Sequence, residues 1–134
     1  MSFMLDTNIC IYAIKKRPPQ VMRRLEENEK RGLFISSVTL AELRHGVEKS
    51  AYPLKNELAL LQLSAILEIL PFDEAAAVEY GKIRAFLQRQ GSPIGPLDTL
   101  IAAHAKSKGM TLVTNNTCEF ARVPGLELAN WAED

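Results

Sequence analysis

The chain begins with a short apolar run that ends on an acid, and this run constrains the fold more than any other part of the sequence. Residues 3–5 are apolar, and Asp6, Thr7 and Asn8 follow them directly. Three apolar residues cannot form an amphipathic helix, so the run predicts a buried strand. Thr7 and Asn8 are available to cap the helix that follows. Asp6 therefore stands where a buried strand passes into a helix, either as a helix cap or as part of a site.

Similar short apolar runs recur along the chain and alternate with helical patterns. After residues 3–5, strands are predicted at 33–35, 69–72 and 111–114, with a possible fifth edge strand at 126–128. Helices are predicted at 9–14, 21–30, 39–49, 54–67, 74–90 and 97–108. This alternation predicts an α/β fold, with a parallel sheet of four to five strands flanked by helices. Residues 1–134 are predicted to form one domain, because no linker, repeat or low-complexity segment interrupts them.

The composition excludes several classes of protein. The 134 residues are 47% hydrophobic and 24% charged, which is ordinary for a globular protein. No stretch approaches 18 apolar residues and the apolar start is too short for a signal peptide, so we expect a cytoplasmic protein without a membrane partner. Cys10 and Cys118 are isolated, which predicts reduced thiols. With His45 and His104 as the only histidines, a histidine-rich zinc site is excluded.

Charge is balanced over the whole chain but not along it. The formal net charge is zero. Residues 15–31 hold seven Lys or Arg and three Glu, a local excess of four positive charges. This segment is either the solvated face of a helix or a basic strip that suits a phosphate backbone.

The helix predicted at 54–67 is apolar on more than one side. Leucine occupies positions 54, 58, 60, 61, 63 and 67. Such a helix buries two faces, either deep in the core or against both the domain and a partner.

Four acids fall at strand ends or in the first turns of helices, and Asp6 is the first of them. Glu42 lies three residues after Thr39, which is also the spacing of a capping box. Asp98 lies two residues after Pro96, where a carboxylate stabilises the helix dipole. Glu119 follows the strand at 111–114 and is equally ordinary in a first turn. Each acid alone has a structural explanation.

Together the four acids predict a site. The carboxyl ends of parallel strands meet at one edge of the sheet, so Asp6, Glu42, Asp98 and Glu119 are expected to face one another. Clustered carboxylates repel unless a cation or a proton lies among them. Oxygen ligands without histidine or thiolate favour Mg²⁺ or Mn²⁺, and such a cluster is typical of phosphoryl chemistry.

These residues stand within segments that are similar to those of a known family. The segments are residues 4–8, 36–43 with Gly46 and Glu48, 93–105, 112–116, 119–120, 123–126 and 130–131. The chain resembles the PIN-domain ribonucleases and, within them, the VapC toxins of type II toxin–antitoxin modules. The resemblance covers nearly the whole chain and implies a parallel sheet wrapped by helices.

The resemblance implies a magnesium-dependent nuclease, in which Mn²⁺ can replace Mg²⁺. Asp6, Glu42 and Asp98 match the family's catalytic acids, with Asp6 and Asp98 as direct metal ligands and Glu42 binding through water. Asn116 departs from the pattern, because many PIN domains have an aspartate there. Glu119 would supply the fourth carboxylate instead.

Supporting residues and partners follow from the same resemblance. Thr7 and Thr114 are expected to orient ligands or water around the metal. Family members form homodimers, and a VapB-type antitoxin blocks the acidic pocket, binds operator DNA within the complex and leaves the toxin unable to inhibit translation. The partner groove is expected at the helix 54–67 and the first helices. The substrate implied is RNA, namely initiator tRNA cut in its anticodon stem-loop.

Two other functions remain open at this point. One is a non-catalytic PIN-fold module that binds a partner and DNA. The other is a phosphoacceptor receiver domain, which also places acids at strand ends but requires an additional acidic pair near the first strand.

Overall fold

A parallel sheet forms the centre of the protein. The computed structural model describes residues 2–133; Met1 and Asp134, the ends of the predicted domain, lie outside the described residues. Within residues 2–133, five strands pair in the order β3-β2-β1-β4-β5, and every pair is parallel. The strands are β1 (Phe3–Leu5), β2 (Leu33–Ser36), β3 (Glu68–Leu70), β4 (Thr111–Val113) and β5 (Leu128–Ala129). The α/β fold predicted from the sequence is confirmed. Receiver domains order their strands 2-1-3-4-5, so the receiver alternative is wrong.

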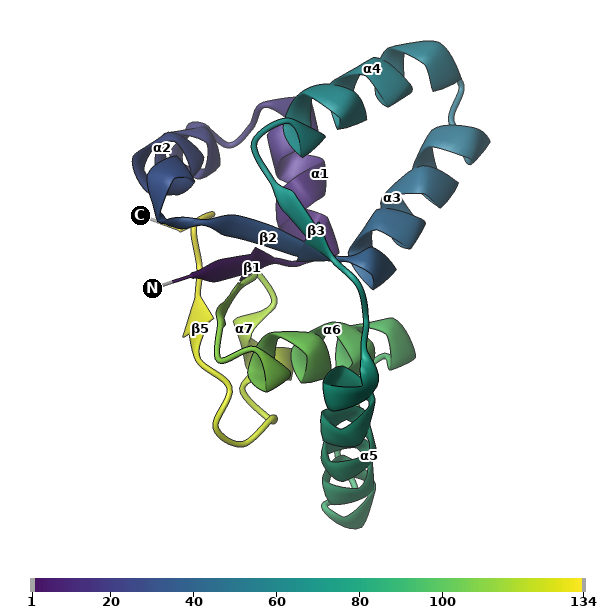
Figure 1. Cartoon of the computed structure of the whole chain (residues 1–134), viewed down its shortest axis with the longest axis vertical. Coiled ribbons are helices and arrows are strands. Elements are labelled where there is room, and N and C mark those ends of the chain that lie inside the picture. The colour runs from purple at the N-terminus through teal and green to yellow at the C-terminus, as the bar shows by residue number, and fades with distance from the viewer. Residues whose placement is uncertain (1, 134) are drawn as a thin grey trace.

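Helices cover both faces of the sheet, as Figure 1 shows. One layer consists of α1 (Thr7–Lys15), α2 (Pro19–Asn28), α3 (Ser37–Lys49) and α4 (Pro53–Ser64). The other consists of α5 (Glu74–Arg89), α6 (Pro96–Ser107) and the short α7 (Thr117–Phe120). A single 3₁₀ turn, η1 (Glu29–Arg31), joins α2 to β2.

Each helical layer packs on its own hydrophobic core. On the α1–α4 side the cluster includes Leu5, Ile9 and Ile35, all fully buried. On the α5–α7 side it includes Met4 and Leu112. Successive residues of β1 thus point to opposite cores, which is why residues 3–5 form one continuous apolar run.

The starts of two helices bear on the predictions for acids. Asp6 caps α1, as one of its two predicted roles requires, because its Oδ1 accepts a 2.9 Å hydrogen bond from the backbone N–H of Ile9; Thr7 and Asn8, which were also available as caps, lie within the helix. Ser36 caps α3 through the N–H of Val38 at 3.1 Å. The capping box expected for Glu42 is therefore wrong, because α3 begins two residues before Thr39.

Other boundaries moved by a few residues. The helix expected at 54–67 ends at Ser64, and β3 begins at Glu68. The edge strand expected at 126–128 is β5, Leu128–Ala129. Neither α7 nor η1 was predicted as an element, because segments of three or four residues carry no periodic pattern.

α4 buries one face, not two. Leu60 and Leu63 are buried, whereas Leu54, Leu58 and Leu61 are 84%, 57% and 58% exposed. The deep-core interpretation of this helix is therefore wrong. Within residues 2–133 no helix is both long and apolar enough to cross a membrane. Both cysteines are free, as predicted, with Cys10 buried and Cys118 exposed.

Candidate active site

Asp6 lies at the carboxyl end of β1, in the centre of the sheet. Its side chain is only 3% exposed. It accepts hydrogen bonds from the backbone N–H groups of Ile9 and Asn8 and from the Thr114 hydroxyl. Burial nevertheless raises the pKa of Asp6, and the negative charge of Glu42 raises it further. Asp6 therefore acts both as a helix cap and as a member of a carboxylate cluster.

Thr114 ties the end of β4 to Asp6. Its fully buried hydroxyl donates to the Asp6 carboxylate and accepts from the backbone N–H of Asn116 at 2.9 Å. The Asn116 amide in turn donates to Oε2 of Glu119 at 2.7 Å. A continuous hydrogen-bonded path thus connects Asp6 to Glu119 through the β4–α7 turn.

Glu42 comes from the second turn of α3. Its Oε1 accepts a 2.7 Å hydrogen bond from the hydroxyl of Thr7, which lies 35 residues earlier in the chain. This bond joins the start of α1 to α3 at the edge of the sheet. Glu42 therefore connects two helices, a role that the expected capping box within α3 would not give it.

Asp98 lies in the first turn of α6, and the pKa of its carboxyl group is strongly raised. Its pKa is raised to about 6, first by burial and then by the negative charges of Glu119, Asp6 and Glu42. A lone first-turn acid stabilised by the helix dipole would have a lowered pKa. The raised value therefore reflects burial first, and then the crowding of Asp98 by carboxylates from three other segments.

Glu119 supports this cluster from α7. Its Oε1 accepts a 3.0 Å hydrogen bond from the backbone N–H of Gly95, and Asn116 occupies Oε2. These bonds, the one from Gly95 first, hold the pKa of Glu119 below its usual range. When Asp98 carries a proton, its carboxyl can donate to Glu119, which is a further, smaller cause of both pKa shifts. Both oxygens of Glu119 are thus engaged within the protein.

Three of the four acids line one open pocket of about 440 Å³, here called the acidic pocket. They are Asp6, Glu42 and Asp98. Glu119 is not part of the lining and reaches the pocket through Asp98. The structure therefore brings all four predicted acids together, three at the surface of the pocket and one behind it.

Several lining residues were not singled out from the sequence. Asn8 of α1, together with His45, Gly46 and Lys49 of α3, faces the acidic pocket. A Cβ at Gly46 would meet no atom within 4 Å, so packing does not require glycine there. The spacing from Glu42 by three and seven residues would have placed His45 and Lys49 on its helix face. The N–H of Gly95 carries no side-chain signal and could not have been found.

The donor set suits a small hard cation. Within residues 2–133 no group of three or more Asp, Glu, His or Cys side chains is placed to hold one ion between them. Mg²⁺ is commonly held by one or two carboxylates and keeps several waters. Asp6 and Asp98 fit that pattern, because the pKa of each is raised and a cation between them would offset the repulsion of their negative charges.

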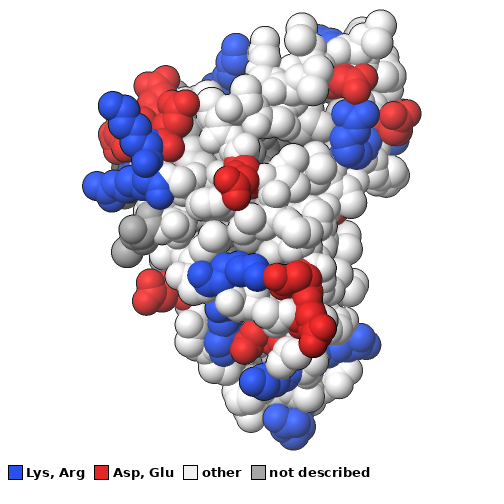
Figure 2. Space-filling view, viewed as in Figure 1, with Lys and Arg blue, Asp and Glu red and all other residues white. Residues whose placement is uncertain are grey.

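The basic strip expected at residues 15–31 is not continuous. Arg23 lies 3.9 Å from Glu27 on α2, and η1 precedes β2, at the opposite edge of the sheet from the acids. Residues 15–17 lie at and just beyond the C-terminal end of α1. Figure 2 shows mixed groups of acidic and basic side chains on one face, separated by a mostly uncharged area that has an acidic side chain near its centre.

Comparison with known proteins agrees with this geometry. A sequence profile of the PIN domain matches residues 3–126. The chain belongs to the PIN-domain family. A relative in Shigella flexneri, the tRNA(fMet)-specific endonuclease VapC, is 48% identical over 132 residues, covering 98% of this chain and 99% of its own. The resemblance to the VapC group is thereby confirmed.

Solved structures extend the match from sequence to fold. A chain in the promoter-DNA complex of VapBC2 from Rickettsia felis superposes on this PIN domain with a TM-score of 0.94 at 45% identity, covering 98% of this chain and 99% of that one. The corresponding values for DNA-bound VapBC from Salmonella typhimurium are 0.92 and 46%, with 98% of each chain covered. The fold of this protein is therefore very similar to that of chains in crystal structures of VapBC complexes.

Proposed function

We propose that this PIN domain is a magnesium-dependent endoribonuclease toxin that hydrolyses a phosphodiester bond in structured RNA, with initiator tRNA as the first candidate. The observation that carries the proposal is the meeting of Asp6, Glu42 and Asp98 in one pocket. The pKa of about 6 at Asp98 supports it, because the cluster is arranged at a cost in repulsion that a structural role does not require.

Asp6 and Asp98 would hold the metal. When bound, Mg²⁺, or Mn²⁺ in its place, would supply a positive charge that polarises the phosphate and makes a nearby water more acidic. Thr114 fixes the orientation of Asp6 through its hydroxyl, and Glu119 with Asn116 fixes Asp98.

Glu42 is better placed than Glu119 to orient the attacking water. Only one of its oxygens, Oε1, has a hydrogen-bond partner within residues 2–133, the hydroxyl of Thr7. Glu42 lines the acidic pocket, so its second oxygen could accept a proton from a water bound there. Both Glu119 oxygens are already engaged.

The substrate proposal rests on relatives. The Shigella flexneri relative is named a tRNA(fMet)-specific endonuclease, and a Haemophilus influenzae relative, 44% identical over 131 residues, is named a ribonuclease. Cleavage of initiator tRNA in the anticodon stem-loop would inhibit translation, and the cytoplasm would be the place of action.

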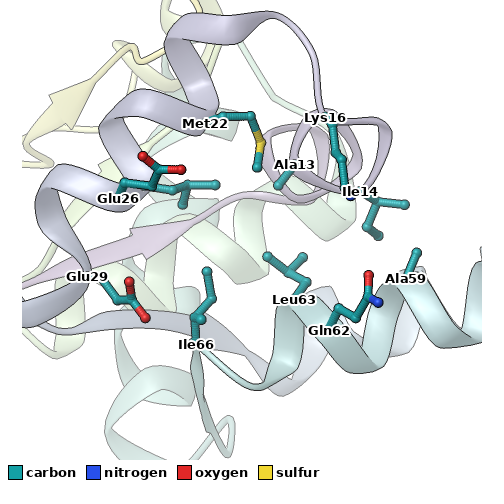
Figure 3. Close-up of a pocket in the computed structure, with 11 residues that line it drawn as sticks. Ala13, Ile14, Lys16, Met22, Glu26, Glu29, Ala59, Gln62, Leu63 and Ile66 are labelled. Carbon is teal, nitrogen blue, oxygen red and sulfur yellow. The ribbon is translucent and has the colours of Figure 1, made fainter.

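The natural partner proposed is a VapB-type antitoxin, docked in an apolar groove between α1, α2 and α4. This groove encloses about 240 Å³, and Figure 3 shows Met22, Leu63 and Ile66 pointing into it. Glu26 and Glu29 border it on the α2 side. An amphipathic helix fits such a groove by its apolar face. Operator DNA would be bound only by the toxin–antitoxin complex, and the chain would form a homodimer.

The decisive experiment is cleavage of end-labelled total tRNA by the purified chain. We expect cutting with added Mg²⁺ or Mn²⁺, none with a chelator, and at least about a 100-fold slower rate for Asp6→Asn. Glu48→Gln, an exposed acid on α3, is the matched control and should cut at the parent rate.

A chain that cuts no RNA with either ion, or an Asp6→Asn variant as active as the parent, would refute the nuclease. The alternative, a non-catalytic module that binds a partner and DNA, predicts that Asp98→Ala retains all function without a divalent ion.

A further inference from the structure

A second hollow lies beside the acidic pocket, at the other end of the same face of α1. It has a volume of about 460 Å³ and is lined by Tyr12, Lys15, Arg17, Pro18, Asn115 and Ala132. We call it the basic pocket. No acid is among these lining residues, in contrast to the acidic pocket.

α1 borders both pockets. Asn8 lines the acidic pocket, and Tyr12 and Lys15 line the basic one. Positions four and seven residues apart lie on one face of a helix, so these three form a single stripe of α1. Asn115, which also lines the basic pocket, directly follows Thr114, the residue that donates to Asp6. An RNA strand that followed this stripe of α1 away from the acidic pocket would reach the basic pocket.

The floor of the basic pocket is a chain of hydrogen bonds. The amide of Asn130 donates to Oδ1 of Asn115 at 3.2 Å, and the Asn115 amide donates to Oη of Tyr12 at 3.2 Å. Asn130 is itself fixed, because its Oδ1 accepts from the backbone N–H of Ala132 at 2.9 Å. The Tyr12 hydroxyl hydrogen and one Asn115 amide hydrogen then remain available to a ligand.

The rim of the basic pocket carries cations that the fold does not use. Lys15 and Arg17 are exposed, and neither forms an ion pair within residues 2–133. Lys16 between them takes the left-handed conformation, with φ of 58°, as the C-cap of α1. This turn leaves Lys15 and Arg17 at the basic pocket and places Lys16 at the apolar groove instead.

We propose that the basic pocket binds the RNA strand on one side of the cleaved bond. Lys15 and Arg17 contact the phosphates, Tyr12 offers an aromatic surface to a base, and Asn115 donates to that base or its sugar. The inference rests on the proposed function and adds to it the subsite that holds the substrate. Cations outside the acidic pocket are required there, because the carboxylates repel every phosphate except the one neutralised by a metal.

RNA is favoured over a protein partner by the chemistry of the lining. The basic pocket combines two cations, one aromatic ring and amide groups, which is the usual composition of a single-strand binding surface. The apolar groove, by contrast, is lined by Met22, Leu25, Leu63 and Ile66, as a docked helix requires. The two surfaces lie on different sides of α1 and suit different ligands.

The test measures RNA binding separately from cleavage. In the Asp6→Asn background, the affinity for fluorescein-labelled total tRNA is compared between Lys15→Gln/Arg17→Gln and Lys30→Gln/Arg31→Gln. The control pair removes the same charge from exposed positions of η1, at the opposite edge of the sheet. Loss of two phosphate contacts should lower the slope of log affinity against log salt by about 1.4 and the affinity at 0.1 M salt on the order of 20-fold.

Cleavage by the active protein supplies the second measurement. Lys15→Gln/Arg17→Gln should raise KM for tRNA by a similar factor and change kcat by less than about twofold. The reason is that these residues bind a part of the RNA that lies away from the cleaved bond. Asn115→Ala should raise KM less, since it removes one neutral hydrogen bond.

The outcomes separate the two proposals. If the parent cleaves tRNA but the Lys15/Arg17 variant binds and cleaves like the Lys30/Arg31 variant, the basic pocket is not an RNA subsite and the nuclease stands. If the variant keeps its RNA affinity and loses only its affinity for the VapB-type antitoxin, the pocket belongs to the partner and the inference is overturned. If the parent neither binds nor cleaves RNA, both proposals fail together.

Discussion

Of the hollows that α1 borders, the acidic pocket and the apolar groove are opposite in character. Its N-terminal end lines the acidic pocket, where Asp6 is held with two other carboxylates at the edge of the sheet. Its other side lines the apolar groove, where Ala13 and Ile14 face α2 and α4. In the acidic pocket, like charges lie close together. In the apolar groove, apolar side chains are left partly exposed to solvent.

This difference indicates how substitutions in each hollow should affect the stability of the folded protein. Crowded carboxylates oppose folding, so Asp98, which caps no helix, can be replaced with little harm to stability. The floor of the apolar groove belongs to the hydrophobic core, so truncation there lowers stability before it affects a partner. Each prediction below tests this contrast.

The largest effect is expected at Asp98. Asp98→Asn should slow RNA cleavage at least about 100-fold, because it removes a proposed metal ligand. The free energy of unfolding of the metal-free protein should stay constant or rise, since the burial and repulsion that raise the pKa of Asp98 to about 6 are relieved. Cleavage kinetics and urea unfolding at pH 7.5 measure the two quantities. A clear loss of stability would mean that Asp98 is mainly structural.

The groove should respond in the opposite way. Leu63→Ala removes a core side chain and should lower the free energy of unfolding by about 2–4 kcal/mol. Leu58→Ala is the matched control on α4, and its exposed side chain should contribute less than about 0.5 kcal/mol. At a temperature where both variants are folded, cleavage per folded molecule should equal that of the parent. Slower cleavage by Leu63→Ala under that condition would show that the groove and the acidic pocket are coupled.

The same contrast explains what the sequence could predict. The acids of the pocket lie at points where strands pass into helices, and the parallel topology alone brings such points together. Asp6 and Asp98 could be found this way because each follows a strong local signal, an apolar run or a proline at a helix start. The fold class followed from the same alternation of strands and helices.

What the sequence could not supply was contact between segments. Thr39 and Glu42 have the spacing of a capping box but do not form one. Ser36 is the N-cap of α3, so Thr39 lies within the helix. The burial of one side of α4 depends on how α1 and α3 pack on it, which no periodicity in α4 reveals. The hydrogen bond from Gly95 to Glu119 joins a backbone group to a residue 24 positions away and leaves no pattern in either segment.

A smaller effect is expected behind the acids, at Thr114. Thr114→Val keeps the shape of the side chain and removes the hydroxyl that joins Asp6 to the Asn116 N–H. Cleavage should slow by about 10- to 100-fold, as for other groups that orient metal ligands. Thr114→Ser retains the hydroxyl and should recover most of the rate. Equal rates for valine and serine would show that the methyl group, not the hydroxyl, matters at this position.

The smallest effect concerns the dependence of stability on pH. The pKa of Asp98 rises from 3.8 to about 6 on folding, so between these values the folded state binds more protons than the unfolded state. The stability contributed by the bound proton is complete below pH 3.8 and is lost as the pH rises through about 6. Because the side chain is partly exposed, we expect a loss on the order of 1 kcal/mol after allowing for solvent screening.

This loss should disappear in Asp98→Asn and should be reversed by Mg²⁺. Urea unfolding between pH 4.5 and 7.5 with a chelator measures the slope for the parent and the variant, whose difference isolates Asp98 from the other acids. Added Mg²⁺ should stabilise the parent more at pH 7.5 than at pH 5, because the ion and the proton compete for the same carboxylates. If parent and variant have parallel profiles, the acids do not repel one another in the folded protein, and the acidic pocket differs from the groove only in polarity.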